Sequence, residues 1–336
     1  MSRYAKQELF RPLGKEGQAR LGRSRVTIVG LGALGSMLAN HLGRAGVGFL
    51  RLVDRDFVEL DNLQRQVLYD EEDVRAALPK AAAAAEKLRR INSEVKVEAR
   101  VCDVNYANAE ELARDVDVLL DGTDNFETRF VLNDACVKLG RPWVYGGCVG
   151  SYGMAMAVLP GEGPCFTCLL GGMPAPGSSP TCDTAGVLNT AVAVVASLQA
   201  NEALKLLVGK REALSGGLQT LDLWTNVFQL VRIPRSPGCP TCVERKFPHL
   251  ESNPSAATSL CGRNAVQITP APGSTLDLAE AERKLAPLGA VRRNAYLLKF
   301  AVDGCELTLF PDARAIIQGT DDLAKARSLY SRYVGA

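Results

Sequence analysis

A glycine-rich turn directly after a buried strand constrains the fold of this chain more than any other feature. Residues 26–31, VTIVGL, form an uninterrupted apolar run. Gly30, Gly32 and Gly35 then give the pattern G-x-G-x-x-G. The first glycine allows a tight turn, the second lets the backbone approach a phosphate, and the third lets the following helix pack on the strand. Because the exposed N–H groups and the dipole of such a helix attract an anion, the pattern predicts a nucleotide-binding unit.

An acidic residue at the end of the second predicted strand supports a nucleotide. Asp54 follows the glycines by about 20 residues, the distance at which a carboxylate accepts hydrogen bonds from ribose hydroxyls. An NAD-dependent oxidoreductase would show the same two features, so they leave the kind of nucleotide open. A tight turn without a ligand is the structural alternative.

Apolar runs alternate with helical periodicity along the first half of the chain, which predicts a doubly wound, mostly parallel Rossmann-like α/β sheet. Alternating residues at 217–233 predict an antiparallel extension of this sheet. We expect a main domain over residues 1–243, a linker at 244–258 and a small C-terminal α+β domain of unknown role at 259–336. The expected strands are 26–31, 49–56, 95–104, 116–121, 143–146 and 154–159, and the expected helices are 33–44, 80–91, 127–139 and 186–208.

Charge and composition exclude several classes of protein. The chain has 336 residues and a net charge of +2, without a basic tract, so nothing indicates a nucleic-acid surface or anionic lipid. The N-terminus lacks the apolar run of a signal peptide, and the apolar segment 186–198 is too short to span a bilayer. We therefore expect a cytoplasmic protein, in which the ten cysteines are metal ligands or reactive thiols rather than disulfides.

Three charged residues beyond the second strand indicate a triphosphate. Arg65, in LDNLQRQ at 60–66, and Lys80 supply more positive charge near the glycine turn than a dinucleotide needs. Asp124, in DGTDN at 121–125, follows the fourth strand, where a carboxylate can hold Mg²⁺ against phosphate oxygens. Taken singly, Arg65 and Lys80 would each fit a solvated surface charge.

Four cysteines form two C-x-x-C pairs, Cys165 with Cys168 and Cys239 with Cys242, with 70 residues between the pairs. Four thiolates in two chelating pairs suit a closed tetrahedral Zn²⁺ site. The wide spacing predicts that the metal joins distant segments of the chain. A redox C-x-x-C, or cysteines without a metal, are the alternatives.

Cys182 stands alone in PTCDTAG, just before the apolar helix expected from residue 186. A thiol near a helix N-terminus has a lowered pKa, which favours the thiolate. The residues leave two interpretations open, a catalytic thiol and a loop thiol without a role.

Taken together and in this order, these segments resemble the family of ThiF, MoeB and HesA, the bacterial relatives of ubiquitin-activating enzymes. The likeness covers residues 3–242 and is closest to ThiF with a C-terminal extension. The shared segments are RYAKQ at 3–7, GLGALG at 30–35, LVDRDFVELDNLQRQ at 52–66, PK at 79–80, DGTDN at 121–125 and the two cysteine pairs.

The resemblance implies ATP-dependent adenylylation of the C-terminal glycine of a small ubiquitin-like sulfur-carrier protein that ends in Gly-Gly. The carrier would be ThiS-like and serve thiamine thiazole biosynthesis, or MoaD-like and serve molybdopterin biosynthesis. The shared motifs do not separate these two. An NAD-dependent oxidoreductase would leave DNLQR, Lys80 and DGTDN together without a reason, and a non-catalytic scaffold would leave the charged residues without one.

The family's functional residues carry over position by position. The resemblance implies that the four cysteines are zinc ligands. It implies that the following residues bind ATP: Gly30, Gly32, Ala33, Gly35, Asp54, Asn62, Arg65, Lys80, Asp124 and Asn125. Gly32 and Ala33 would offer backbone to the phosphates, and Asp54 would bind the ribose. Arg65 and Asn62 would reach the phosphates. The residues implied to act in catalysis are Arg65, Lys80, Asp124 and Cys182. Lys80 would stabilise charge at the reacting centre, Asp124 would be the Mg²⁺ ligand, and the thiol of Cys182 would take the activated carrier.

One residue departs from the family pattern. Lys6 stands where the family often has an arginine that reaches the phosphates of the neighbouring subunit in a homodimer. A lysine keeps the charge but loses the bidentate geometry of a guanidinium. Lys6 would therefore act as a point charge, or the contact is made by another residue.

Overall fold

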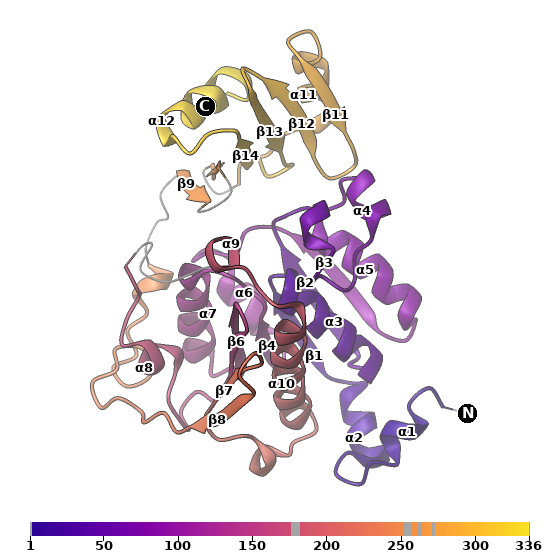
Figure 1. Cartoon of the computed structure of the whole chain (residues 1–336), viewed down its shortest axis with the longest axis vertical. Helices are drawn as coiled ribbons and strands as arrows, with labels where there is room; N and C mark the ends of the chain where they lie inside the picture. The colour runs from indigo at the N-terminus through magenta and orange to yellow at the C-terminus, as the bar shows by residue number, and fades with distance from the viewer. Residues whose placement is uncertain (1, 176–181, 252–256, 261–263, 271–272, 336) are drawn as a thin grey trace. The chain divides into compact units, whose positions relative to one another are not determined.

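The computed structural model describes residues 2–175, 182–251, 257–260, 264–270 and 273–335 (Figure 1). The chain forms two compact units, Met1–Ser252 and Asn253–Ala336. Within the described ranges, every helix is too short or too polar to cross a membrane.

The first unit is built on an eight-stranded sheet with the order β3-β2-β1-β4-β5-β6-β7-β8. The first five strands in sequence are parallel, and the last three pair antiparallel. The predicted mostly parallel sheet with an antiparallel extension is therefore confirmed. The strands are β1 (Arg25–Val29), β2 (Phe49–Asp54), β3 (Lys96–Val101), β4 (Val118–Asp121), β5 (Trp143–Val149), β6 (Tyr152–Val158), β7 (Leu218–Asp222) and β8 (Val227–Val231).

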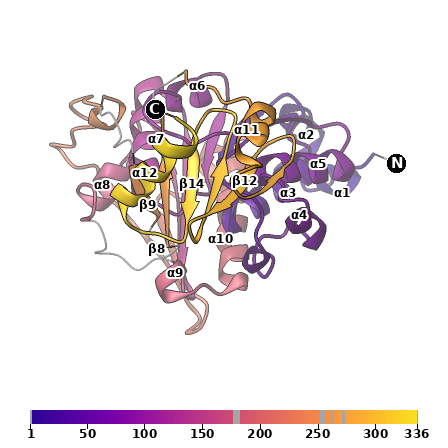
Figure 2. The same ribbon diagram turned by 90° about the horizontal axis from the view of Figure 1, so that it is seen from above.

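Helices cover both faces of this sheet because its central strands are apolar on both faces. Residues such as Ile28 pack with α3 (Ala33–Ala45), α5 (Lys80–Ile91) and α10 (Asn189–Leu207). Their neighbours, such as Val29, pack with α6 (Ala109–Arg114) and α7 (Phe126–Leu139) on the opposite face (Figure 2). The shorter helices of this unit are α1 (Ala5–Glu8), α2 (Gly14–Leu21), η1 (Leu60–Asn62), α4 (Glu71–Arg75), α8 (Phe166–Leu170), α9 (Cys182–Ala185), η2 (Arg211–Ala213) and η3 (Pro248–Leu250).

The connectivity fixes where a ligand belongs. The chain runs outward from β1 through β2 to β3 and then returns to β4 on the other side of β1. In an open parallel sheet, ligands bind at the carboxyl ends of the strands where the strand order reverses. In this sheet that place is the edge at which β1 and β4 end.

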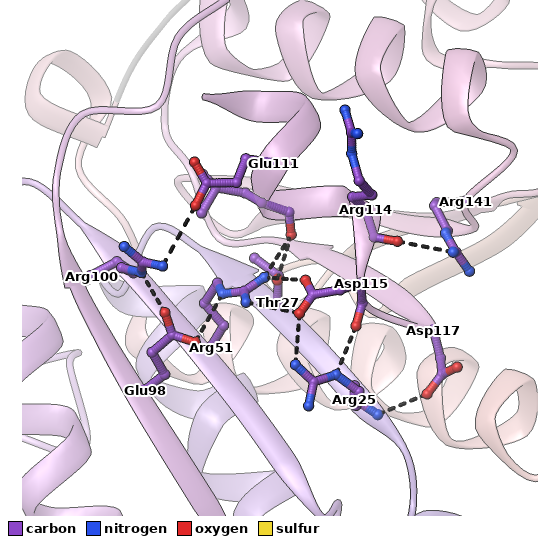
Figure 3. Close-up of polar contacts among 11 residues, drawn as sticks. Arg25, Thr27, Arg51, Glu98, Arg100, Glu111, Arg114, Asp115, Asp117 and Arg141 are labelled. Carbon is purple, nitrogen blue, oxygen red and sulfur yellow. Dashed lines mark hydrogen bonds and ion pairs between the residues drawn. The ribbon is translucent and has the colours of Figure 1, made fainter. Parts of the chain in front are cut away.

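An arginine–carboxylate cluster lies on the α6 face of the same strands (Figure 3). Arg51 of β2 lies beside Glu98 of β3, and its guanidinium contacts Asp115, with Nη1 and Oδ1 separated by 2.6 Å. Arg25, at the start of β1, reaches the other oxygen of Asp115 at 2.7 Å. Thr27 of β1 is paired with Arg51 of β2, and its hydroxyl donates to the Leu112 carbonyl at 2.8 Å. The cluster therefore ties three strands to the segment that follows α6.

The second unit is a six-stranded antiparallel sheet with the order β11-β12-β13-β14-β10-β9 and its own apolar core. Strand β9 begins at Ala257, inside the range that the sequence assigns to a linker. The elements are β9 (Ala257–Leu260), β10 (Ala265–Ile268), α11 (Leu278–Leu285), β11 (Ala290–Arg293), β12 (Leu298–Val302), β13 (Cys305–Leu309), β14 (Ala315–Gln318) and α12 (Leu323–Tyr333).

Candidate functional site

The glycine turn is packed backbone against backbone. Gly30 has a φ of +80°, and a Cβ added there would lie 2.7 Å from the carbonyl atoms of Gly122. A Cβ on Gly35 would lie 1.8 Å from the Gly30 oxygen. At Gly32, by contrast, an added Cβ would meet only Gln66 Nε2, at 3.8 Å. The end of β1, the first turn of α3 and the end of β4 therefore touch directly, while Gly32, which caps α3, leaves its side of the turn open.

Asp54 fastens the end of β2 to this turn. Its Oδ2 accepts the Leu31 N–H at 2.6 Å, and its Oδ1 accepts the Asp56 N–H at 2.7 Å. The side chain is buried, and burial raises the pKa of this carboxyl, against the opposing charge of Lys80. Asp54 therefore lies at the glycine turn, as the ribose-binding prediction requires, and its carboxylate is already engaged with backbone.

Lys80 begins α5 and is 4% exposed, so it is not the solvated surface charge of the alternative interpretation. Its Nζ lies 3.6 Å from Asp56 Oδ2. The Tyr69 hydroxyl, 2.9 Å from the Leu31 carbonyl oxygen and 3.2 Å from that of Lys80, joins α5 to the glycine turn.

Arg55 adds a second, partly buried cation that the sequence did not single out. It pairs with Asp103 at 3.0 Å, beyond the end of β3. Burial alone would lower the pKa of Arg55, but the surrounding carboxylates, Asp103 foremost, raise it. Asp124 is among those carboxylates, so its charge acts on the same region as Asp54 and Asp56. The only sequence signal for Arg55 is its place between two acids in DRD.

The turn between β4 and α7 separates two aspartates by environment. Asp121 is fully buried, accepts from the Thr123 N–H at 2.8 Å and pairs with Arg129 Nε at 3.0 Å. Arg129 also donates to the carbonyls of Thr123, at 2.5 Å, and Gly146, at 3.1 Å. Asp124 is exposed, as a cation ligand needs to be. Arg129 thus holds in place the turn that carries Asp124, a role that the sequence analysis missed.

Two residues predicted to bind the nucleotide take part in helix capping, Asn125 as an N-cap and Asn62 as the last residue of η1, bonded back to the Glu59 N-cap. Asn125 is the N-cap of α7 and accepts the Thr128 N–H at 2.8 Å. Asn62 is buried, donates to Asp61 Oδ1 at 2.7 Å and accepts the Glu59 N–H at 3.2 Å. Their predicted contacts with ATP stay predictions.

The connection after η1 approaches the turn through Gln66. This residue is 3% exposed, lies beside Gly32, and its Oε1 has no hydrogen-bond partner among the described residues. A buried unpaired acceptor beside the glycine turn suits a hydrogen-bond donor of a bound molecule. Arg65, the preceding residue, is half-buried and donates to the Asp61 carbonyl at 2.8 Å. The sequence analysis named Arg65 but not Gln66.

Lys6 is not brought to these residues within the chain. Arg3 donates to the Ile91 carbonyl at 2.8 Å, and Gln7 donates to that of Ala45 at 2.9 Å, so α1 is fixed at the C-terminal ends of α5 and α3. Lys6 remains exposed, close to Leu9 and Phe10, which are 72% and 62% exposed.

The four predicted metal ligands converge. Their Sγ atoms all lie within 4.8 Å of one another. The distances across the two pairs are 3.6 Å for Cys165 to Cys239 and 3.5 Å for Cys168 to Cys242, and Cys165 lies 3.9 Å from Cys168. Four sulfurs that each bind Zn²⁺ at about 2.3 Å in a tetrahedron lie about 3.8 Å apart, so the donor set fits this ion. A redox pair would not need the second pair of thiols.

The predicted role of Cys182 is untested. Helix α9 begins at this residue, and the Cys182 side chain lies outside the part of the chain that the structure describes.

The fold and these sites define an α/β protein of the nucleotide-binding type with a four-cysteine cluster that could hold a metal ion. The model of the ThiF family matches residues 4–241, and the chain belongs to this family. The sulfur carrier protein ThiS adenylyltransferase of Bacillus subtilis is 47% identical over 337 residues, which cover 99% of both chains. The SAMP-activating enzyme E1 of Haloferax volcanii is 41% identical over 244 residues, 73% of this chain and 89% of that one.

Solved structures show the same fold. Escherichia coli MccB with ATP has a TM-score of 0.61 at 23% identity and covers 72% of this chain and 74% of its own. PaaA has a TM-score of 0.58 at 25% identity and covers 70% of this chain and 73% of its own.

Proposed function

We propose that this protein uses ATP to adenylylate the C-terminal glycine of a small ubiquitin-like sulfur-carrier protein of the ThiS type. The observation that carries the proposal is the 47% identity to a ThiS adenylyltransferase along 99% of both chains. Asp54 bonded to the glycine turn, Lys80 acting on Asp54, and the 122–123 segment beside Asp124 packed against Gly30 agree with it.

The chemistry needs electrostatics more than a nucleophile on the protein. A carboxylate oxygen of the carrier's last residue forms a bond to the α-phosphorus of ATP, the bond from that phosphorus to the bridging oxygen breaks, and pyrophosphate leaves. The protein must neutralise phosphate charge and hold attacking and leaving oxygens in line. The chain has only His41 and His249, and this reaction requires no histidine base.

Each site residue has a part in this reaction. The N–H groups of Gly32 and Ala33 bind the phosphates, and Asp54 accepts from the ribose. Arg65 and Lys80 neutralise charge that moves onto the pyrophosphate. Asp124 holds Mg²⁺, which when bound supplies a Lewis acid to the phosphate oxygens.

Assembly and domain roles complete the proposal. A homodimer would place the exposed Lys6 of one subunit near the phosphates of the other, with Leu9 and Phe10 covered. The adenylation domain is residues 1–243, which agrees with the family match over 4–241. The protein acts in the cytoplasm, and Cys182 takes the activated carrier during sulfur transfer.

The first test is ATP–pyrophosphate exchange with a ThiS-like carrier that ends in Gly-Gly, with a carrier that lacks the last glycine as control. Exchange that depends on the terminal glycine is the expected result. A parallel reaction with a MoaD-like carrier separates the two pathways, because the faster carrier identifies the pathway. Folded, zinc-loaded protein that exchanges with neither carrier would contradict the proposal.

A separate measurement tests the dimer. Light scattering at micromolar concentration is expected to give twice the mass of one chain. A monomer would remove Lys6 from the nucleotide site, because no described contact brings it there within one chain.

A further inference from the structure

Both cysteine pairs have the same residue in third position. The pairs read Cys-Phe-Thr-Cys at 165–168 and Cys-Pro-Thr-Cys at 239–242. Thr167 is 8% exposed and Thr241 is 1% exposed, so the two hydroxyls are withdrawn from water. Their Oγ1 atoms lie 3.1 Å apart, so the two C-x-x-C segments, residues 165–168 and 239–242, meet at the threonines.

Helix α7 supplies a partner to each threonine. Asn133 Nδ2 donates to Thr167 Oγ1 at 3.2 Å, and Thr241 Oγ1 donates to Asp134 Oδ1 at 3.1 Å. Asn133 and Asp134 are both fully buried. Asp134 Oδ2 also accepts the His249 N–H at 3.1 Å, which fixes the segment that follows the second cysteine pair.

These contacts fix the direction of each hydrogen bond that connects Asn133, Thr167, Thr241 and Asp134. Asn133 Oδ1 accepts the Phe166 N–H at 3.0 Å, so the nitrogen of this amide must face Thr167. Thr167 already accepts from Asn133, and Thr241 already donates to Asp134. The hydroxyl of Thr167 therefore donates to that of Thr241, and the four groups form one directed chain that ends on a carboxylate. Directed chains of this kind polarise one another, and bonds to an ionised acceptor are the strong ones.

We propose that Thr167 and Thr241 are positioning residues of the metal centre, and that the hydrogen-bond chain Asn133–Thr167–Thr241–Asp134 holds the two C-x-x-C segments at the separation a metal ion needs. Each threonine is covalently next to a ligand, Cys168 or Cys242, so fixing the threonine pair also fixes the sulfur pair. The inference concerns the metal centre and does not depend on the identity of the carrier.

Helix α7 links the metal centre to the nucleotide region. Arg129, which holds the Asp124 turn, lies four residues before Asn133, about 6 Å along the helix axis. Two successive turns of α7 therefore contact the two sites. If the two C-x-x-C segments moved, α7, the helix that also carries Arg129, would be the first to move with them.

The test measures the rate at which zinc leaves the loaded, full-length protein for an excess of a chromophoric chelator. Thr167→Val and Thr241→Val keep the shape of the side chain and remove the hydroxyl. Loss of groups that orient metal ligands costs about 10–100-fold in metal affinity, so we expect release at least about tenfold faster than in the unchanged protein. Thr241→Ser keeps the hydroxyl and is expected to restore slow release.

Thr27→Val is the matched control. Thr27 is also buried and also donates one hydrogen bond, to Leu112, but it lies on β1 and outside the two C-x-x-C segments. We expect this variant to lose stability without faster zinc release. If the variants at 167 and 241 release zinc no faster than Thr27→Val, the threonines only contribute to general stability and the proposal is wrong.

Asn133→Asp tests the direction of the chain and serves if a valine variant does not fold. An aspartate at 133 keeps an acceptor for Phe166 but has no proton for Thr167. Both threonine hydroxyls would then donate outward, leaving two oxygens facing each other without a proton. Faster zinc release is expected, whereas unchanged release would overturn the assigned chain.

Discussion

Asp121 and Asp124 are three residues apart and differ in what surrounds them. The buried Asp121 is paired with Arg129 and bonded to Thr123, so it holds the β4–α7 turn. Asp124 is exposed, and its charge acts on Arg55. The motif DGTDN therefore combines a buried structural acid with an exposed acid that we propose as the Mg²⁺ ligand.

Asp124→Ala and Arg65→Ala are expected to lower the rate of carrier adenylylation by about a hundredfold or more, the usual result of losing one electrostatic contact to the transition state. Pyrophosphate exchange under saturating carrier measures this rate. Glu127→Ala is the control, because Glu127 is an exposed acid at the start of the same helix. A near-normal rate in either variant would remove that residue from the mechanism.

Gly35→Ala is expected to destabilise the fold by about 3 kcal/mol or more, because the new methyl group would meet the Gly30 oxygen and neither backbone can move aside. Gly163→Ala is the control, since an added Cβ there meets nothing within 4 Å. Thermal unfolding of both proteins measures the difference. Equal melting temperatures would show that the glycine turn can relax.

At the residue scale, the sequence predicted the parts whose chemistry is local. The glycine spacing, Asp54 and the cysteine pairs each follow from one short segment. Arg129 and the threonine pair do not, because their partners come from other elements, and a sequence pattern does not show which elements meet. Gln66 was missed for a similar reason, since only the fold places it beside Gly32.

At the scale of elements, the differences from prediction have local physical causes. The helix expected from 186 begins at Asn189, because Gly186 has a φ of +71° and Val187 bridges to Gly150 in extended form. The short helix α8 lies in a segment for which the sequence analysis predicted no helix or strand. Its five residues follow Cys165, and a single apolar turn is too short to show helical periodicity in a sequence.

The arginine–carboxylate cluster of Figure 3 leads to a prediction about how the stability of the fold depends on pH. Hydrogen bonding from Arg51 holds the pKa of Asp115 well below its usual range. A depressed carboxyl pKa stabilises the folded protein above the unfolded pKa of about 4, and this contribution is lost as the pH falls further. Because Asp115 is half-exposed, we expect Asp115→Asn to cost about 1 kcal/mol near neutral pH.

Urea unfolding at a series of pH values measures this effect. The gap in unfolding free energy between the two proteins should close below about pH 4. Glu212→Gln, at an exposed acid without a described ion pair, is expected to show no gap at any pH. A gap that is independent of pH would mean that Asp115 acts through packing rather than charge.

At the scale of the whole molecule, the four-cysteine cluster proposed to bind zinc belongs to the first unit alone. The second unit has its own apolar core and its own sheet. Removal of zinc by a chelator should therefore increase amide hydrogen exchange around 165–171 and 235–250 and leave 290–318 unchanged. Exchange that rises equally in both units would contradict this independence.

The order in which the ligands appear along the chain has a consequence for biosynthesis. The 70 residues between Cys168 and Cys239 include β7, β8 and all of α10. A ribosome must therefore synthesise the whole antiparallel extension before the second ligand pair exists. Closing a loop of that length costs about 4 kcal/mol in chain entropy, which folding of α10 onto the sheet must first offset. Until then the nascent chain presents a single thiol pair, half of the four ligands that a closed tetrahedral site needs, so the four-cysteine cluster can assemble only after residue 242 has left the exit tunnel.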